Sequence, residues 1–194
     1  MLKKIAVTGG VASGKTTVCR IFEELGASVV FADAVVHELL KSDTDLGKKV
    51  VREFGPEIVK NGQIDRKILG NLVFKDAKAL KKLESLIHPA VLKRVDEEYK
   101  MAKGTSFVVE IPLLYEIGAE EDFDIVIAVA CDEQIAKKRF AHGEKEYDLR
   151  MQQQLKPEIK AARAHYTITN NGTLEDLRHS VIRINRIIHS TDVK

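Results

Sequence analysis

The residues best suited to chemistry in this sequence form the run 9–16, Gly-Gly-Val-Ala-Ser-Gly-Lys-Thr, directly after the apolar stretch 5–7. The run fits the pattern G-x-x-x-x-G-K-[ST], which is typical of a phosphate-binding loop between a buried strand and a helix. The backbone N–H groups of such a loop bind a polyphosphate together with the positive end of the following helix. Lys15 can reach the β- and γ-phosphates, and the Thr16 hydroxyl can coordinate Mg²⁺. Because strand, loop and helix come in the required order, the sequence predicts binding of a nucleoside triphosphate rather than a turn without a ligand.

Two carboxylates stand at the ends of predicted strands and are candidates for catalysis. Ligands of open parallel sheets bind beyond the carboxyl ends of the strands, where Asp33 and Glu110 are expected. Asp33 could cap a helix over 34–40, or it could be the base that accepts a proton from an attacking hydroxyl. A carboxylate would repel a phosphate acceptor, so the catalytic interpretation favours an alcohol acceptor. Glu110 could hold a water on Mg²⁺ or position the acceptor, or it could form an ion pair with a nearby Lys or Arg.

Phosphoryl transfer develops negative charge on the transferred oxygens and therefore needs further cations. Arg139 is the best candidate, because it lies near the end of a helix predicted over 133–141 and precedes an irregular charged segment. Arg150 and Arg163 flank the same region. Each of the three could instead be an exposed arginine that interacts with the dipole at a helix C-terminus. The six histidines lack the spacing and the accompanying CxxC that are typical of a zinc site.

Five short apolar runs predict the strands of a buried parallel sheet, with helical patterns between them. The strands are expected at 4–8, 28–31, 106–111, 125–130 and 166–169. The first helix is expected to run from Lys15 to about Gly26, and the last to start after Thr173. This alternation is typical of a three-layer α/β/α fold with a five-stranded parallel sheet.

Two stretches depart from the regular alternation. Residues 34–105 are mostly helical in pattern and far longer than one crossover helix requires. They predict a helical insertion within a single domain that spans residues 1–194. Residues 141–154 are charged and poorly periodic, which indicates a mobile flap.

The composition is that of an ordinary globular protein, with 44% apolar and 31% charged residues. A net charge of +2 is too small to indicate nucleic acid or an anionic membrane as the main partner, and no apolar run is long enough to span a membrane. Cys19 and Cys131 are isolated in apolar surroundings, so both are expected to be buried, reduced thiols. These features predict a cytoplasmic protein.

An ordered series of motifs, spread over nearly the whole chain, resembles the dephospho-CoA kinase family. The matching segments are 7–17 (Val-Thr-Gly-Gly-Val-Ala-Ser-Gly-Lys-Thr-Thr), Phe31-Ala32-Asp33 with His37, 62–66 (Gly-Gln-Ile-Asp-Arg), Val73-Phe74, 83–89 (Leu-Glu-Ser-Leu-Ile-His-Pro), 111–116 (Ile-Pro-Leu-Leu-Tyr-Glu) and 168–172 (Ile-Thr-Asn-Asn-Gly). A phosphate-binding loop alone is shared by many families, but this series is specific.

The resemblance implies a P-loop NTPase fold and phosphorylation of the ribose 3′-hydroxyl of dephospho-CoA by ATP with Mg²⁺, the last step of coenzyme A biosynthesis. It implies that the insertion 34–105 binds the CoA moiety and that 141–154 form a lid. Asp33 would be the base, Lys15 the phosphate ligand and Arg139 a cation on the lid side. The candidate residues are Gly10, Val11, Ala12, Ser13, Gly14, Lys15, Thr16, Thr17, Arg139, Asn171 and Gly172 for the nucleotide; Asp33, His37, His88, Pro112, Leu113 and Glu116 for the acceptor; and Thr16 and Glu110 for the metal. The protein is expected to be a monomer or a weak homo-oligomer.

Three features depart from the usual pattern of that family. Ala12 stands where the family usually has Gly, so a methyl group crowds the loop. Phe31 replaces the first acidic residue of the D-A-D segment. The lid is shortened by several residues and lacks an Arg-Asp pair around 141–144.

Two other functions fit part of the pattern. A different P-loop kinase could act on a nucleoside or a nucleoside monophosphate, although Asp33 and the length of the insertion argue against the monophosphate. A nucleotide switch would use the insertion as an effector surface and would hydrolyse its nucleotide slowly without an acceptor. A guanine-specific switch would also carry an N/T-K-x-D segment, which the sequence lacks.

Overall fold

The computed structural model describes residues 2–73 and 75–190, and the chain divides into two compact units. The first unit comprises Met1–Val30 and Ala102–Lys194, and the second comprises Phe31–Met101. Phe74, which belongs to the matching segments of the sequence, lies outside the described residues.

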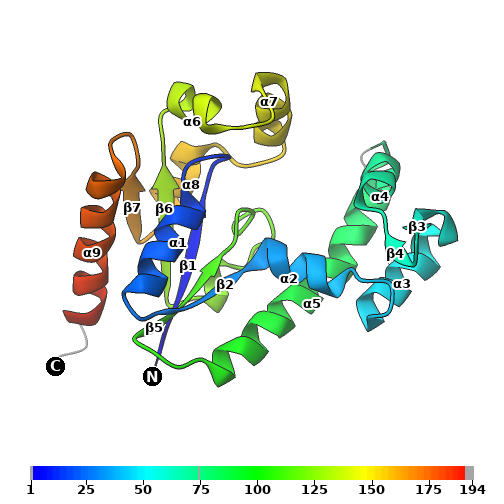
Figure 1. The fold of residues 1–194 in the computed structure, drawn as a ribbon, viewed down its shortest axis with the longest axis horizontal. Coiled ribbons are helices and arrows are strands. Elements are labelled where there is room, and N and C mark those ends of the chain that lie inside the picture. The colour runs from blue at the N-terminus through cyan, green and yellow to red at the C-terminus, as the bar shows by residue number, and fades with distance from the viewer. Residues whose placement is uncertain (1, 74, 191–194) are drawn as a thin grey trace. The chain divides into compact units, whose positions relative to one another are not determined.

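The first unit is built on a five-stranded parallel sheet with the strand order β2-β5-β1-β6-β7 (Figure 1). Its strands are β1 (Lys3–Gly9), β2 (Ser28–Phe31), β5 (Ser106–Glu110), β6 (Ile125–Ala130) and β7 (Tyr166–Thr169). All five predicted strands are confirmed to within one residue at either end.

The central strand β1 is covered on both faces. Ile5, Ala6 and Val7 are all fully buried, and successive residues of a strand point to opposite faces of the sheet. The helices α1 (Lys15–Glu24) and α9 (Leu174–Ser190) contact each other on one face, and α8 (Pro157–Arg163) packs on β1 and β6 from the other (Figure 1). The remaining elements of this unit are the short helix η2 (Glu120–Asp122), α6 (Glu133–Arg139) and α7 (Glu144–Gln152). The predicted three-layer α/β/α fold is therefore confirmed.

The second unit is helical apart from one short hairpin. Its elements are α2 (Ala32–Leu39), α3 (Asp45–Phe54), η1 (Pro56–Ile58), β3 (Val59–Lys60), β4 (Gln63–Ile64), α4 (Arg66–Val73) and α5 (Ala77–Met101). Asn61 and Gly62 have φ of +50° and +74°, as a two-residue hairpin turn of type I′ requires. Asp65 then starts α4, because its Oδ1 accepts from the backbone N–H of Lys67 (2.9 Å) and Ile68 (3.1 Å). The matching segment 62–66 is thus a hairpin turn followed by a helix start.

The second unit has an apolar core of its own. Its buried residues come from the end of α2, from α3, from the hairpin region, and from α4 and α5. They are Leu40, Leu46, Val50, Phe54, Ile58, Ile64, Leu69, Val73 and Leu83. Because this cluster lies entirely within residues 31–101, the segment holds itself together through local packing.

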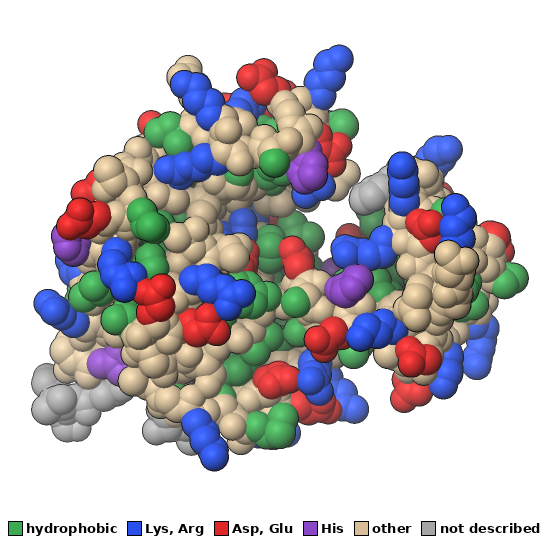
Figure 2. Space-filling model, in the orientation of Figure 1, with side chains coloured by type: hydrophobic (Ala, Val, Ile, Leu, Met, Phe, Trp, Pro, Cys, Tyr) green, Lys and Arg blue, Asp and Glu red, His purple; other side chains and the backbone are tan. Residues whose placement is uncertain are grey.

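The surface carries charges of both signs. Lys and Arg side chains are interspersed with Asp and Glu over the face shown in Figure 2, in keeping with the net charge of +2. No described helix combines the length and apolar character that crossing a membrane requires. Cys19 and Cys131 are both free thiols. The expectation of burial is confirmed for Cys19 but wrong for Cys131, which is half-exposed because it follows the carboxyl end of β6.

Candidate nucleotide-binding and phosphoryl-transfer site

The phosphate-binding loop (residues 9–16) connects β1 to α1, and the segment after β7 braces it. Gly14 is the N-cap of α1 and has φ +100°, which a side chain would strain. A Cβ on Gly14 would also lie 2.1 Å from Nδ2 of Asn170. That nitrogen donates to the main-chain oxygen of Ser13 at 2.8 Å, and Asn170 is only 6% exposed. The glycine of the motif therefore makes room for a contact that holds the loop in shape.

The loop is equipped with donors for an anion. Lys15 is buried, and its ammonium donates to the main-chain oxygens of Gly9 (3.2 Å) and Gly10 (2.8 Å). The hydroxyl of Ser13 is also buried, and among the described residues no group forms a hydrogen bond with its oxygen. A buried cation and a buried hydroxyl without a partner fit a polyphosphate ligand, which would accept from both.

The two residues predicted to bind metal lie in contact. The Thr16 hydroxyl donates to Oε1 of Glu110 at 3.1 Å. Glu110 reaches this place because β5 pairs with β1 in parallel, with Val7 opposite Glu110, just before the loop begins. A hydroxyl and a carboxylate are the oxygen ligands that Mg²⁺ prefers, so this pair fits the ion.

Asp33 lies in the second unit, in the first turn of α2. Phe31 occupies the N-cap position of that helix, so the alternative interpretation of Asp33 as its N-cap is wrong. The reason is that α2 starts directly after β2, two residues earlier than the sequence predicts. Asp33 and His37 are both exposed and stand four residues apart, on one side of the helix.

The third candidate of the second unit, His88, is half-buried in α5 directly before Pro89. Burial lowers the pKa of its imidazole. Burial therefore favours the uncharged form of the ring.

Arg139 is the last residue of α6, which ends two residues before the predicted position. Its Nη1 donates to the main-chain oxygen of Asn170 at 2.9 Å and lies 3.5 Å from Sγ of Cys131. The backbone N–H of Asp132 donates to Oδ1 of Asn171 at 2.9 Å. The structure thus brings Arg139 and Asn171, both predicted to contact the nucleotide, to the carboxyl ends of β6 and β7.

The segment 141–154 contains the helix α7, although its charged sequence predicts a mobile flap. Tyr147 of α7 is buried and belongs to an apolar cluster that includes residues of the phosphate-binding loop. This cluster, called the lid cluster because residues 141–154 are predicted to form a lid, consists of Val11, Ala12, Cys131, Ala136, Phe140, Tyr147 and Met151. Ala12 has φ +54°, in the left-handed region. The Ala12 methyl group, which distinguishes this loop, is therefore partly buried against a cluster that contains residues of the segment 141–154.

The other two arginines are engaged by side chains nearby. Arg150 pairs with Glu146 at 3.0 Å and lies over the ring of Phe140, 5.3 Å from its centroid. Arg163 forms an ion pair with Glu120 and lies 4.3 Å from the ring centroid of Tyr115. Phosphate contact by either arginine stays a prediction.

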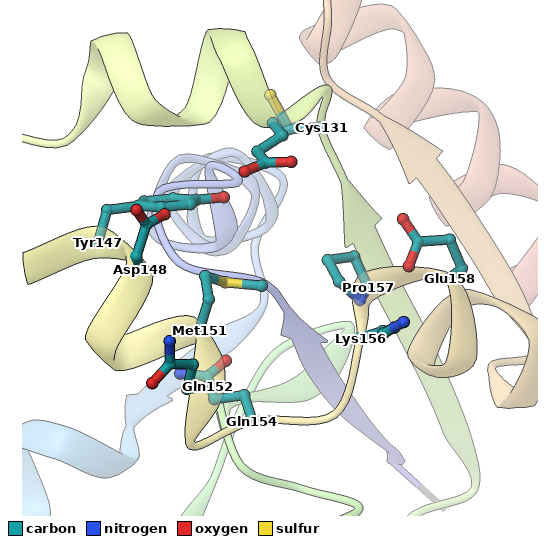
Figure 3. A pocket seen from close by; sticks show the side chains of 10 residues that line it. Cys131, Tyr147, Asp148, Met151, Gln152, Gln154, Lys156, Pro157 and Glu158 are labelled. Atoms are coloured by element: carbon teal, nitrogen blue, oxygen red, sulfur yellow. The ribbon is translucent and has the colours of Figure 1, made fainter. Parts of the chain in front are cut away.

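A cavity of about 790 Å³ opens beside the phosphate-binding loop. Tyr147 and Asp148 of α7 line one side, and Pro157 and Glu158 at the start of α8 line the other (Figure 3). A Cβ on Gly10 would lie 3.2 Å from Cγ of Pro157, so the wall of the cavity touches the loop itself. The cavity therefore adjoins the region predicted to hold the phosphates.

The predicted acceptor residues Pro112, Leu113 and Glu116 lie in the loop after β5. The main-chain oxygen of Pro112 accepts from the Thr8 hydroxyl (3.2 Å) and from Nζ of Lys160 (2.6 Å). Glu116 forms an ion pair with the same lysine at 2.8 Å. Contact of these residues with an acceptor stays a prediction. Sequence reasoning missed Lys160, because a lysine in a charged helix gives no sign that it will be buried.

A five-stranded parallel sheet whose central strand leads through a glycine-rich loop into a helix, with a buried lysine at the turn, defines a P-loop nucleotide-binding protein. A family model described as dephospho-CoA kinase matches residues 3–176. The dephospho-CoA kinase of Protochlamydia amoebophila (strain UWE25) is 42% identical over 189 residues, which cover 93% of each chain.

Solved structures agree. The protein TT1252 from Thermus thermophilus superposes with a TM-score of 0.83 at 31% identity, over 94% of this chain and 96% of that one. A dephospho-CoA kinase from Campylobacter jejuni superposes with a TM-score of 0.74 at 27% identity over 100% of both chains. The chain belongs to the dephospho-CoA kinase family, and the resemblance seen in the sequence is confirmed.

Proposed function

We propose that this protein transfers the γ-phosphoryl group of ATP to the ribose 3′-hydroxyl of dephospho-CoA and releases coenzyme A and ADP. The observation that carries the proposal is the family match over residues 3–176, which begins with the strand and loop of the phosphate site. The alcohol acceptor agrees with the argument from the charge of Asp33, which would repel a phosphate acceptor.

In this proposal the phosphate-binding loop holds the triphosphate. Lys15 and the loop N–H groups bind the β- and γ-phosphates. The buried ammonium supports this, as does the buried Ser13 hydroxyl, which has no hydrogen-bond partner among the described residues. Thr16 and Glu110 would hold Mg²⁺, which supplies positive charge at the phosphate oxygens. Asn171 and Gly172 lie beside the adenine, and Arg139 adds a cation on the lid side.

Asp33 acts as the base. As the 3′-oxygen attacks the γ-phosphorus, the new P–O bond forms, the bond to the ADP oxygen breaks, and the hydroxyl proton passes to Asp33. The support is its exposed place in the first turn of α2, directly after a strand of the sheet that carries the phosphate-binding loop. His37, His88, Pro112, Leu113 and Glu116 are proposed to contact the acceptor, and the insertion 34–105 to bind its CoA moiety.

The segment 141–154 is the lid in this mechanism. Its apolar contact with Val11 and Ala12 supports a place above the phosphates. A lid there excludes water, so that the γ-phosphoryl group is transferred to the acceptor and ATP is not hydrolysed. We also propose that the protein works in the cytoplasm. We further propose that it is a monomer or a weak homo-oligomer, and sedimentation at a series of protein concentrations tests this oligomeric state.

The test of the function is ADP formation from ATP and Mg²⁺ with and without dephospho-CoA, combined with chromatography of the product and determination of the phosphate position. Acceptor-dependent ADP matched one for one by coenzyme A supports the proposal. A rate of ADP formation that is the same with and without dephospho-CoA indicates a hydrolase or a nucleotide switch. Activity only with nucleosides or nucleoside monophosphates indicates a different P-loop kinase.

A further inference from the structure

Lys160 is fully buried in α8 although it carries an ammonium group. Burying a charged amine is costly unless acceptors take its N–H groups. Three oxygens lie within reach of Nζ: the main-chain oxygen of Pro112 at 2.6 Å, Oε1 of Glu116 at 2.8 Å and Oε1 of Gln154 at 3.4 Å. Burial lowers the pKa of Lys160, and the carboxylate of Glu116 opposes that shift. The hydrogen bonds of the buried ammonium therefore depend on Pro112, Glu116 and Gln154 lying together beside Lys160.

Glu116 ties this junction to the end of the lid. Its Oε1 also accepts from the main-chain N–H of Leu155 at 2.8 Å, and Leu155 is the first residue after the lid segment 141–154. The same junction reaches the strand before the phosphate-binding loop, because the Pro112 oxygen accepts from the Thr8 hydroxyl at 3.2 Å. The ion pair of the buried Lys160 with the half-buried Glu116 thus connects the C-terminal end of the lid to the sheet next to the nucleotide site.

The middle of the lid rests on the loop itself. Tyr147 packs with Val11 in the lid cluster, and Sδ of Met151 would lie 3.7 Å from a Cβ on Gly10. These apolar contacts, together with an ion pair of 2.9 Å between Asp148 and Lys137 of α6, hold the middle of the lid. The junction at Lys160 supplies a second point, which sets how far along the chain the lid extends over the loop.

We propose that Lys160 and Glu116 are positioning residues that anchor the C-terminal end of the lid, so that residues 141–154 keep their register over the phosphate-binding loop during phosphoryl transfer. This inference rests on the proposed kinase function. A lid without its anchor admits water, so transfer to the acceptor slows and a larger share of the ATP is hydrolysed. ATP binding itself stays intact, because the loop N–H groups and Lys15 are untouched.

A double variant separates anchoring from stability. Removing one partner of a buried ion pair leaves an unpaired charge and lowers stability, whereas replacing both by apolar side chains is often neutral. Lys160→Met/Glu116→Leu therefore leaves no unpaired charge, but it cannot accept from the Leu155 N–H. The single variants Lys160→Met and Glu116→Gln are expected to melt at lower temperature than the double variant.

The experiment compares the full-length double variant with wild type in Tm, KM for ATP, kcat with dephospho-CoA, and the ratio of ADP to phosphorylated product. We expect a Tm and a KM for ATP close to wild type, a kcat about 10- to 100-fold lower, and ADP in excess of product. Lys103→Met removes an exposed lysine from the loop before β5, outside the lid and the proposed site, and is the matched control, expected to behave as wild type.

Wild-type kcat and wild-type product ratio in the double variant would overturn the proposal. So would a defect confined to KM for the acceptor, because that result assigns Glu116 to substrate binding. Amide hydrogen exchange of the wild-type protein gives a test that needs neither a variant nor a substrate. The Leu155 amide should exchange more slowly than the exposed amides of residues 141–143. If the Leu155 amide exchanges as fast as those amides, the proposed anchor is wrong. If wild type makes no acceptor-dependent product, the proposed function fails while the exchange result still decides the anchor.

Discussion

Arg139 and Asn170 are joined by a hydrogen bond of 2.9 Å from the guanidinium to the main-chain oxygen, and the side chain of Asn170 in turn donates to Ser13 in the phosphate-binding loop at 2.8 Å. The helix α6 is therefore connected to the loop through the polar contacts of Asn170, in addition to the apolar cluster that contains Ala136 and Val11. A change at Arg139 removes a cation and also loosens the bracing of the loop.

Arg139→Ala should lower kcat by about 10- to 100-fold with a small effect on KM for dephospho-CoA, because transition-state charge loses a nearby cation. Steady-state kinetics with both substrates varied measures this. Lys138→Ala, an exposed cation on the same helix, is the control and should retain wild-type rates. An effect limited to acceptor binding would remove Arg139 from the lid-side role.

Lys15→Ala should impair both ATP binding and transfer, because the buried ammonium is the positive charge at the centre of the loop. Equilibrium titration with a fluorescent ATP analogue and the coupled ADP assay report the two effects separately. Arg20→Ala, an exposed cation further along α1, is the comparison. Normal kinetics of Lys15→Ala would contradict the phosphate-loop assignment.

Asp33→Asn should lower turnover by roughly 10²- to 10⁴-fold and leave ATP affinity nearly unchanged, because an amide cannot take the proton of the attacking hydroxyl. Glu38→Gln is the matched control, since Glu38 is an exposed acid of the same helix. Equal turnover in Asp33→Asn and wild type would exclude Asp33 as the base.

Glu110→Gln should raise the Mg²⁺ concentration needed for half-maximal rate by about tenfold, because the Thr16 hydroxyl then stands beside a neutral amide. A titration of rate against free Mg²⁺ at saturating ATP measures the shift, and excess EDTA should abolish activity in both proteins. An unchanged Mg²⁺ dependence, with a raised KM for dephospho-CoA, would move Glu110 to acceptor positioning.

Ala12 lies at φ +54°, where a β-branched side chain is far more strained than a methyl group. Ala12→Val should therefore distort the loop and weaken ATP binding by at least about tenfold. Ala12→Gly should change the free energy of unfolding by no more than about 1 kcal/mol. Glycine removes the backbone strain at positive φ, but it also gives the unfolded chain more conformational freedom and removes a methyl contact in the lid cluster. Chemical denaturation and ATP titration of both variants provide the measurement, and a valine variant that binds ATP normally would refute the strained geometry.

The sheet was predictable because each strand is a short apolar run bounded by turn residues, and the parallel arrangement of β1 and β5 then brings Thr16 to Glu110. The hairpin β3–β4 was not, because strands of two residues have no periodicity, although Asn61-Gly62 is the turn that forms it. α7 was not predicted either, since Tyr147 is its one fully buried side chain and gives no apolar stripe. The pairing of Lys160 with Glu116 joins segments far apart in the sequence, so only the packing of α8 on the sheet reveals it.

The central place of β1 has a consequence for biosynthesis. β1 pairs with β5 and β6, and Asn170 holds the loop after β1, so every one of these partners is synthesised after residues 31–101. Residues 31–101 enclose their own core and can fold while translation continues. A nascent chain therefore gains its full affinity for nucleotide only after Asn170 has been made.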